Sequence, residues 1–367
     1  MHNRSVTALL LTLFLARPAR PPVAASTPRP RVANVPAALG LAVNLPESAS
    51  VAERQKALEQ VRRAGASLFS LEVSWPAAEP RPRRYEVASV TRTARLLRQS
   101  GAVLHLDLPI VNGRAREVPA DLAALSFDDP KLAVRLGKLL DALGPALADF
   151  STMSLGNEAD SYFADKPDEL RKFLRLFDGA VDFLGKKAPR LRVGVTTAAP
   201  TDTRAPLVEA ELHRKSPALF YVYAPFSRAA PFLHRPPETI DRDWNAILAA
   251  AGGRPVGFTE VSFSSAPENG STPEKQADFV RRMRRLAAET ERSRLLFARY
   301  VPWRDPDPPT VDHQRLHPLP LGERPGVEGP GGEARRAAFF ANRGLVKADG
   351  RPKPAWREWT KAAAAIP

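Results

Sequence analysis

The sequence of 367 residues contains no cysteine, which excludes disulfide bonds, thiolate metal ligands and cysteine nucleophiles. It also lacks the Gly-X-Y period of collagen, internal repeats of fixed length and heptads. No G-x-G-x-x-G or Walker A pattern is present, so no glycine-rich phosphate loop is indicated. A composition that is 44% hydrophobic and 26% charged is instead typical of a globular protein with a large core.

Acidic residues are few relative to basic ones, 40 against 54, which gives a formal net charge of +14. Such a charge favours an anionic partner, namely nucleic acid, an anionic surface or an acidic substrate. The alternative is that the excess of arginine reflects codon usage and does not indicate an anionic partner. The basic run Arg281–Arg285 is interrupted by Met283 and flanked by Val280 and Leu286, which is typical of an outer helix face. Because no zinc finger, RNA-binding aromatic motif or basic zipper accompanies it, we do not expect nucleic acid as the partner.

The N-terminus has the pattern of an export signal. Arg4 precedes an apolar run over Val6–Ala16, and Val23–Ala25 offers small residues for cleavage. We therefore predict a signal peptide over residues 1–25, a Pro-rich linker over residues 26–36 and a secreted or periplasmic protein. The apolar run is short for a membrane span, so membrane contact is expected only if the signal remains uncleaved.

From residue 37 onward, short β-like runs alternate with longer helical ones. The predicted strands are Leu39–Asn44, Ser67–Trp75, Ala102–Ile110, Phe150–Leu155, Leu191–Thr197, Leu219–Tyr223, Val256–Thr259 and Arg294–Val301. The predicted helices are Val51–Ala64, Thr91–Ser100, Lys131–Leu143, Pro167–Leu184 and Pro273–Glu289. Eight alternations predict an α/β protein with a single (β/α)₈ TIM barrel over residues 37–367, rather than an open doubly wound sheet.

Polar residues alternate with apolar ones on the second and third predicted strands. Glu72 lies on the face opposite Leu71, while His105 and Asp107 lie opposite the leucines of their strand. The apolar face packs under the helices, so the polar face lines the barrel interior. An unpaired charge is costly there. We therefore expect Glu72, His105 and Asp107 to have partners, with arginine as the abundant candidate.

Two glutamates follow predicted strands at the end of the barrel where active sites lie. Glu158 comes directly after the fourth strand, and Glu260 comes after the seventh. A pair of carboxylates that face each other across a pocket is the apparatus of glycoside hydrolysis. One protonates the leaving oxygen, while the other attacks the sugar or activates water.

These residues and several others resemble the clan A retaining glycoside hydrolases. The resemblance runs from about Leu39 to Trp359, and its motifs are Asn157-Glu158, Glu260, Val73-Ser74-Trp75 with Glu79-Pro80 and Tyr85, Trp303 with Asp305, Gly344-Leu345-Val346 and Gly350 to Ala355. It implies a (β/α)₈ barrel that hydrolyses a β-linked oligosaccharide or polysaccharide by double displacement. Glu158 is then the general acid/base and Glu260 the nucleophile. No cofactor and no metal are implied, and we expect a monomer.

The resemblance also implies substrate-binding residues. Asn157 is expected to donate a hydrogen bond to the sugar 2-hydroxyl. Tyr221 or Tyr223 is expected to hydrogen-bond Glu260; the spacing does not decide between them. Trp75 and Trp303 are expected to stack on sugar rings, whose C–H faces are apolar.

Two positions depart from the clan's pattern. Ser70 stands where larger families often carry an arginine in strand two, and Asp107–Ile110 stands where they often carry a histidine pair. These departures motivate an alternative of another class, a barrel that binds carbohydrate or envelope polymer without cleaving it.

A long Pro/Gly-rich stretch, Asp305–Gly332, follows the eighth predicted strand. A segment of that length at the active-site end is predicted to shape the site as a lid. His313 and His317 have metal-ligand spacing, but no third ligand accompanies them, so we expect no metal site.

Overall fold

The computed structural model describes residues 37–45, 48–203, 205–307 and 331–361. The predicted signal peptide and linker lie outside the described residues, as do His313, His317 and most of the stretch that follows the eighth strand. Export and the lid therefore stay predictions. No helix of the described part is both long and apolar enough to cross a bilayer.

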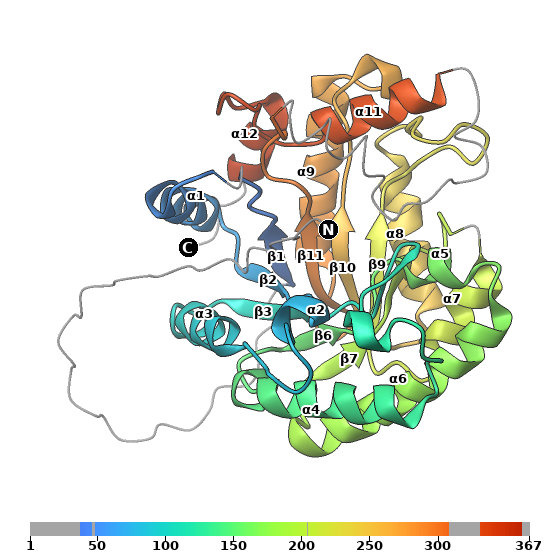
Figure 1. Ribbon diagram of the computed structural model, residues 1–367. Coiled ribbons are helices and arrows are strands. Elements are labelled where there is room, and N and C mark those ends of the chain that lie inside the picture. The colour runs from blue at the N-terminus through green and yellow to red at the C-terminus, as the bar shows by residue number, and fades with distance from the viewer. Residues whose placement is uncertain (1–36, 46–47, 204, 308–330, 362–367) are drawn as a thin grey trace, which may run out of the picture.

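Parallel strands form a nearly closed barrel, so the predicted (β/α)₈ fold is confirmed (Figure 1). In sheet order they are β7 (Arg192–Gly194), β6 (Thr152–Ser154), β3 (Val103–Asp107), β2 (Leu68–Glu72), β1 (Ala38–Leu41), β11 (Leu295–Tyr300), β10 (Val256–Val261), β9 (Leu219–Tyr223) and β8 (Thr196–Ala198). Only Val195 separates β7 from β8, and these pair with β6 and β9 respectively. They are thus the two halves of the fifth barrel strand. A small antiparallel hairpin, β4 (Val111–Asn112) and β5 (Ala115–Arg116), follows β3.

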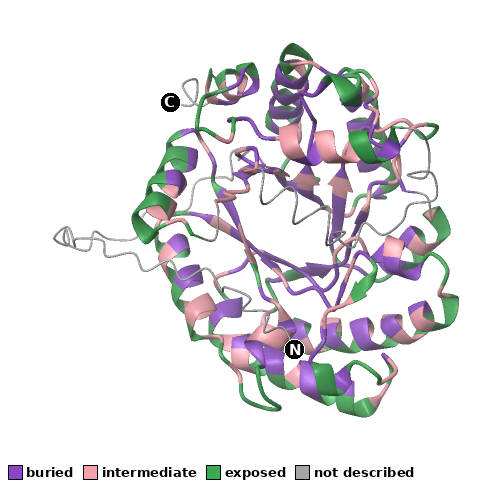
Figure 2. Ribbon diagram, turned by 45° about the horizontal axis from the view of Figure 1, so that its top comes forward, coloured by how far each residue is buried: buried purple, intermediate pink, exposed green. Residues whose placement is uncertain are grey.

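Helices surround the barrel, and buried strands occupy its centre (Figure 2). The five predicted helices are present as α1 (Val51–Arg63), α3 (Ala88–Gln99), α4 (Pro130–Leu147), α6 (Pro167–Lys187) and α9 (Pro273–Glu289). Further helical elements have no counterpart among the predicted helices: α2 (Trp75–Ala78), α5 (Ala159–Phe163), α7 (Pro206–His213), α8 (Thr239–Ala250), α11 (Gly332–Asn342), α12 (Pro354–Lys361) and the 3₁₀ turns Ala120–Leu122 and Pro267–Asn269. The start of α9 follows from local chemistry, because the Thr272 hydroxyl accepts a hydrogen bond from the Lys275 amide and proline is tolerated at the first helical position.

The barrel interior begins with a small apolar cluster near the strand N-termini. Leu68, Phe220 and Phe297 belong to it, and the last two rings stack at 6.0 Å between centroids. Gly257 is required beside them, since a Cβ there would lie 2.7 Å from the Phe297 ring. The His105 ring packs on this cluster at 5.0 Å from both phenylalanine rings and begins the polar layer above it.

Of the three interior residues predicted to need partners, His105 and Asp107 bond each other, whereas the interactions shown for Glu72 are electrostatic. His105 bonds the Asp107 carboxylate at 2.8 Å, and the Ser70 hydroxyl donates to the other carboxylate oxygen at 2.5 Å. Burial alone would raise the pKa of Asp107, but His105, Arg299 and Ser70 outweigh it and hold the pKa at about 2. Arg299 enters the interior over Gly40, where a Cβ would lie 3.1 Å from its Cγ, and donates to the Thr259 carbonyl at 2.7 Å.

The arginine run of α9 is used mainly within the fold. Arg282 and Arg285 both pair with Asp241 of α8, which fixes the two helices to each other. Arg284 is an exception to the predicted outer face, because it is buried with its guanidinium 4.8 Å from the Trp359 ring of α12. These pairings leave little of the run available to an anionic partner.

Candidate active site

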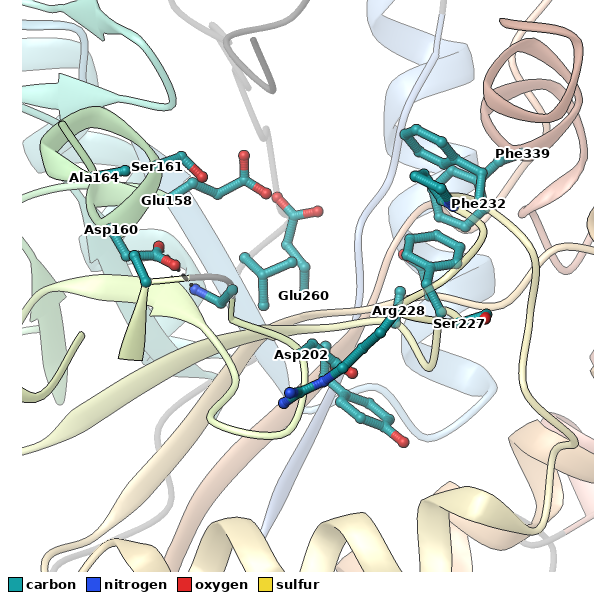
Figure 3. A pocket seen from close by; sticks show the side chains of 18 of the residues that line it. Glu158, Asp160, Ser161, Ala164, Asp202, Ser227, Arg228, Phe232, Glu260 and Phe339 are labelled. Carbon is teal, nitrogen blue, oxygen red and sulfur yellow. Dashed lines mark hydrogen bonds between the residues drawn. The ribbon is translucent and has the colours of Figure 1, made fainter. Parts of the chain in front are cut away.

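A cavity of about 380 Å³ opens at the C-terminal ends of the barrel strands, between α5 and α11 (Figure 3). Carboxylates, arginines and phenylalanines dominate its lining: Glu158, Asp160, Asp165, Asp202, Glu260, Arg114, Arg228, Arg343, Phe226, Phe232, Phe339 and Phe340. It combines an apolar wall with convergent charged groups, which is the usual make-up of a ligand site.

Glu158 caps the N-terminus of α5 in a left-handed backbone conformation, with φ 45° and ψ 41°. Non-glycine residues rarely adopt this region, and the strain costs on the order of 1–3 kcal/mol. The preceding residue is held on both sides: the Asn157 amide donates to the Val111 carbonyl, and its carbonyl accepts from the Gly113 amide, both at 2.9 Å. The β4–β5 hairpin thus fixes the strand end that carries Glu158.

Glu260 reaches the cavity because of a β-bulge. Phe258 pairs with Tyr221 and Glu260 pairs with Val222, which leaves Thr259 as an extra residue in β10. Regular alternation would place Phe258 and Glu260 on the same face, and Phe258 packs outward on Trp244 of α8 at 4.5 Å between ring centroids. The bulge reverses the alternation and turns Glu260 inward. Bulges that redirect a side chain are common next to active sites.

The structure brings Glu158 and Glu260 together in one cavity. Both side chains are partly exposed, and they point toward each other across the cavity (Figure 3). The predicted placement at one rim of the barrel is therefore what the structure has. The acid/base and nucleophile roles of the two residues stay predictions.

Asn157 is partly exposed beside the cavity without being part of its lining. Its side-chain amide donates to the Asn112 Oδ1 atom at 3.0 Å, and so adds a third contact between the end of β6 and the hairpin. Its predicted hydrogen bond to a sugar stays a prediction.

The expectation that Tyr221 or Tyr223 bonds Glu260 is wrong. The Tyr221 hydroxyl donates to Glu209 of α7 at 3.2 Å, and the Tyr223 hydroxyl donates to Asp243 of α8 at 3.1 Å. Both rings lie on the helix-facing side of β9, because residues two apart on a strand share a face. Tyr223 touches the edge of the cavity, but the residue of β9 that projects inward there is Val222.

The expectation that Trp75 and Trp303 stack on sugar rings is also wrong for the described structure. Trp75 is 0% exposed, and its indole N–H donates to the buried Glu79 at 2.9 Å. Trp303 is 5% exposed and packs 6.3 Å from Trp356 of α12. Neither ring lines the cavity. Burial of these large rings contributes to the core instead.

Two charged residues at the site were not predicted to act there. Arg343, directly after α11, lines the cavity with both glutamates. Glu72 is accessible at the barrel mouth, but burial by the surrounding barrel wall raises its pKa to about 7. The charges of Asp107 and Glu260 also raise this pKa, and the charge of Arg299 lowers it. In the sequence, Glu72 could be identified by its inward-facing position on the second strand. Arg343 could be identified only by its position directly before the Gly344-Leu345-Val346 motif.

Other charged residues of the cavity lining form hydrogen bonds or ion pairs within the fold. Asp160 is 3% exposed and accepts hydrogen bonds from the Ala198 amide at 3.0 Å and the Thr203 hydroxyl at 2.9 Å. Asp202 pairs with Arg235 at 2.8 Å. No group of three or more potential ligands in the described part of the chain is arranged to hold a metal ion.

The barrel carries two facing carboxylates at the C-terminal ends of its strands. No protein-family profile and no curated protein matches the sequence. Solved structures do match. GH5_18 from Streptomyces cattleya, in complex with GlcNAc, has a TM-score of 0.60 and 16% identity over 90% of this chain and 80% of that chain.

Two further matches belong to other glycosidases. The exo-β-1,4-mannosidase Op5Man5 from Opitutaceae bacterium strain TAV5 has a TM-score of 0.58 and 16% identity over 90% of this chain and 59% of that chain. Xylanase 10B from Thermotoga maritima has a TM-score of 0.58 and 13% identity over 89% of this chain and 94% of that chain. The chain therefore shares the (β/α)₈ barrel of the clan A glycoside hydrolases.

Proposed function

We propose that the protein is a retaining glycoside hydrolase whose catalytic pair is Glu158 and Glu260. The observation that carries this proposal is the convergence of the two carboxylates in one cavity, from strand ends four and seven of the barrel. Each reaches that position through an unusual backbone feature, a left-handed residue for Glu158 and a bulge for Glu260. Such features persist where the fold over-determines them, which is common at active sites.

The reaction proceeds in two displacements. Glu260 attacks the anomeric carbon as Glu158 gives its proton to the glycosidic oxygen, so the C–O bond breaks and a glycosyl ester forms on Glu260. Glu158 then takes a proton from water, and the oxygen of that water attacks the anomeric carbon. The ester bond breaks, Glu260 leaves as a carboxylate and the sugar keeps its anomeric configuration.

The proposed substrate is a β-linked oligosaccharide or polysaccharide. The support is the class of the matching structures, which includes a β-1,4-mannosidase and a xylanase. A small cavity with an apolar wall favours a short chain or a chain end over a long groove-bound polymer.

A binding barrel without catalysis is the second candidate. The observation that favours it is that neither of the aromatic rings predicted to stack on sugar, those of Trp75 and Trp303, lines the cavity. It predicts glycan affinity with no turnover.

Hydrolysis of a panel of aryl β-glycosides and oligosaccharides separates the two candidates. Glu260→Ala and Glu158→Ala are each expected to lower kcat/KM by 10²-fold or more, because each removes a group that acts in the transition state. Glu274→Ala, an exposed glutamate of α9, is the matched control and is expected to retain full activity. Turnover that persists in Glu260→Ala would contradict the proposed mechanism. Glycan binding without turnover across the panel would establish the second candidate.

A further inference from the structure

One arginine of the cavity lining stands at the end of α11. Arg343 is the C-cap residue of α11 and lines the same cavity as Glu158 and Glu260. A cation at this position is also favourable for the helix, whose C-terminal end carries partial negative charge.

The backbone of Arg343 is tied to the barrel. Its carbonyl accepts hydrogen bonds from the Tyr300 hydroxyl of β11 at 3.0 Å and from the Gln276 amide of α9 at 3.2 Å. Gln276 is 0% exposed, and its Nε2 atom also lies within hydrogen-bond distance of the Phe263 and Gly344 carbonyls, so its two N–H groups are shared among these acceptors. The position of Arg343 is thus set by β11, which pairs with β10, and by α9, which follows β10 in the chain.

The side chain of Arg343 is packed rather than free in solvent. Its guanidinium carbon lies 4.7 Å from the Phe340 ring centroid and 5.3 Å from that of Phe339. Its Nε atom is buried and has no hydrogen-bond partner among the described residues. Burial lowers the pKa of Arg343, while Glu260, Tyr300 and Glu158 oppose that effect through their charges. An arginine remains charged under such conditions, so the cavity holds a permanent cation beside both carboxylates.

We propose that Arg343 is a positioning residue whose charge favours loss of the first proton from the Glu158–Glu260 pair. The catalytic use of this charge rests on the proposed function: Glu260 is then ionised at a pH where Glu158 keeps its proton. Two neighbouring carboxylates repel each other and titrate as a pair in two steps. A fixed cation near both stabilises the ionised forms and lowers the first step.

Other charges face the same space and enter the balance. They are Glu72 of β2 with Asp107 and Arg299 behind it, Arg114 of the hairpin turn, Asp160 and Asp165 at α5, Asp202 after β8 and Arg228 after β9. Asp202 is paired with Arg235, and Arg114 and Arg228 are exposed at the rim, where solvent screens them. Arg343 is instead packed on the aromatic wall, so solvent screens its charge less than it screens those of Arg114 and Arg228.

The test compares Arg343→Met, Arg343→Gln and Arg343→Lys with Arg336→Met. Arg336 is the matched control, because it lies 6.0 Å from the Phe340 ring on the same helix but does not line the cavity. Glutamate carboxyl carbons are labelled with ¹³C and titrated by NMR, with Glu158→Gln and Glu260→Gln for assignment. Thermal unfolding first establishes that each variant is folded.

The first apparent pKa of the pair is expected to rise by about one unit or more in Arg343→Met and Arg343→Gln, and to return most of the way in Arg343→Lys. Arg336→Met is expected to leave it unchanged. The acidic limb of the pH profile of kcat/KM on an aryl β-glycoside is expected to move by the same amount.

The two proposals fail in different ways. If the wild-type protein hydrolyses no glycoside but the two neutral variants still raise the first apparent pKa of the pair, the proposed function is overturned and the role of Arg343 is retained. Glu260-dependent turnover with no titration shift in either neutral variant overturns the role of Arg343. Loss of activity without movement of the pair's pKa also overturns it, because that result indicates a purely structural contribution.

Discussion

At the scale of single residues, the site is a set of charges held in unequal surroundings. Asp107 is ionised inside the barrel because His105 and Ser70 satisfy both of its carboxylate oxygens. Glu72, one strand away in the same register, has the opposite bias: the barrel wall, Asp107 and Glu260 all raise its pKa. One carboxylate of this adjacent pair is thus ionised at acidic pH and the other is half protonated near neutral pH.

The raised pKa of Glu72 predicts that the stability of the fold depends on pH. Its pKa is about 7 in the folded protein against a reference value of 4.5, so it destabilises the fold progressively as the pH rises from 4.5 through 7. Glu72→Gln is expected to raise Tm relative to the wild type at pH 8 and to leave it unchanged at pH 4. Glu274→Gln serves as control in the same calorimetric series. An equal gain at both pH values would contradict the assignment.

At the scale of elements, short features of the chain place the two glutamates of the proposed catalytic pair. The bulge in β10 turns Glu260 inward, and the β4–β5 hairpin together with Asp160 docks α5 and its capping residue Glu158 on the barrel. α11 contributes the apolar wall from the far side, at the end toward which β9 and β10 point (Figure 1). The site thus depends on local irregularities of an otherwise regular barrel.

Asp160→Ala tests the docking of α5. The substitution leaves the Ala198 amide and the Thr203 hydroxyl without their buried acceptor, so it is expected to lower the free energy of unfolding by about 1–3 kcal/mol. Because α5 also positions Glu158, kcat is expected to fall more than KM changes. Asp182→Ala on the exposed face of α6 is the control, expected within about 0.5 kcal/mol of the wild type. Unchanged denaturant unfolding in Asp160→Ala would refute this view of α5.

At the scale of the whole molecule, periodicity predicted the barrel well. All eight strands were located, and α9 was predicted with its observed bounds, because long alternating patterns and proline after a threonine cap are strong signals. The side of β9 that Tyr221 and Tyr223 occupy was not predictable, since a strand of five residues shows its alternation but not which face is inside. The bulge at Thr259 depends on pairing with both neighbouring strands, and the approach of Arg343 depends on a long connection. Neither leaves a local signal.

In the proposed mechanism, Glu260 is the nucleophile of a double displacement. The most direct test of this role is incubation with an activated β-glycoside fluorinated at carbon 2, which slows hydrolysis of the glycosyl-enzyme, followed by mass spectrometry of the intact protein and of its peptides. If Glu260 is the nucleophile, one sugar is added per chain, it is carried by the peptide that contains Glu260, and it is absent in Glu260→Ala. A glycoside substrate hydrolysed with inversion, or an adduct that persists in Glu260→Ala, would contradict it.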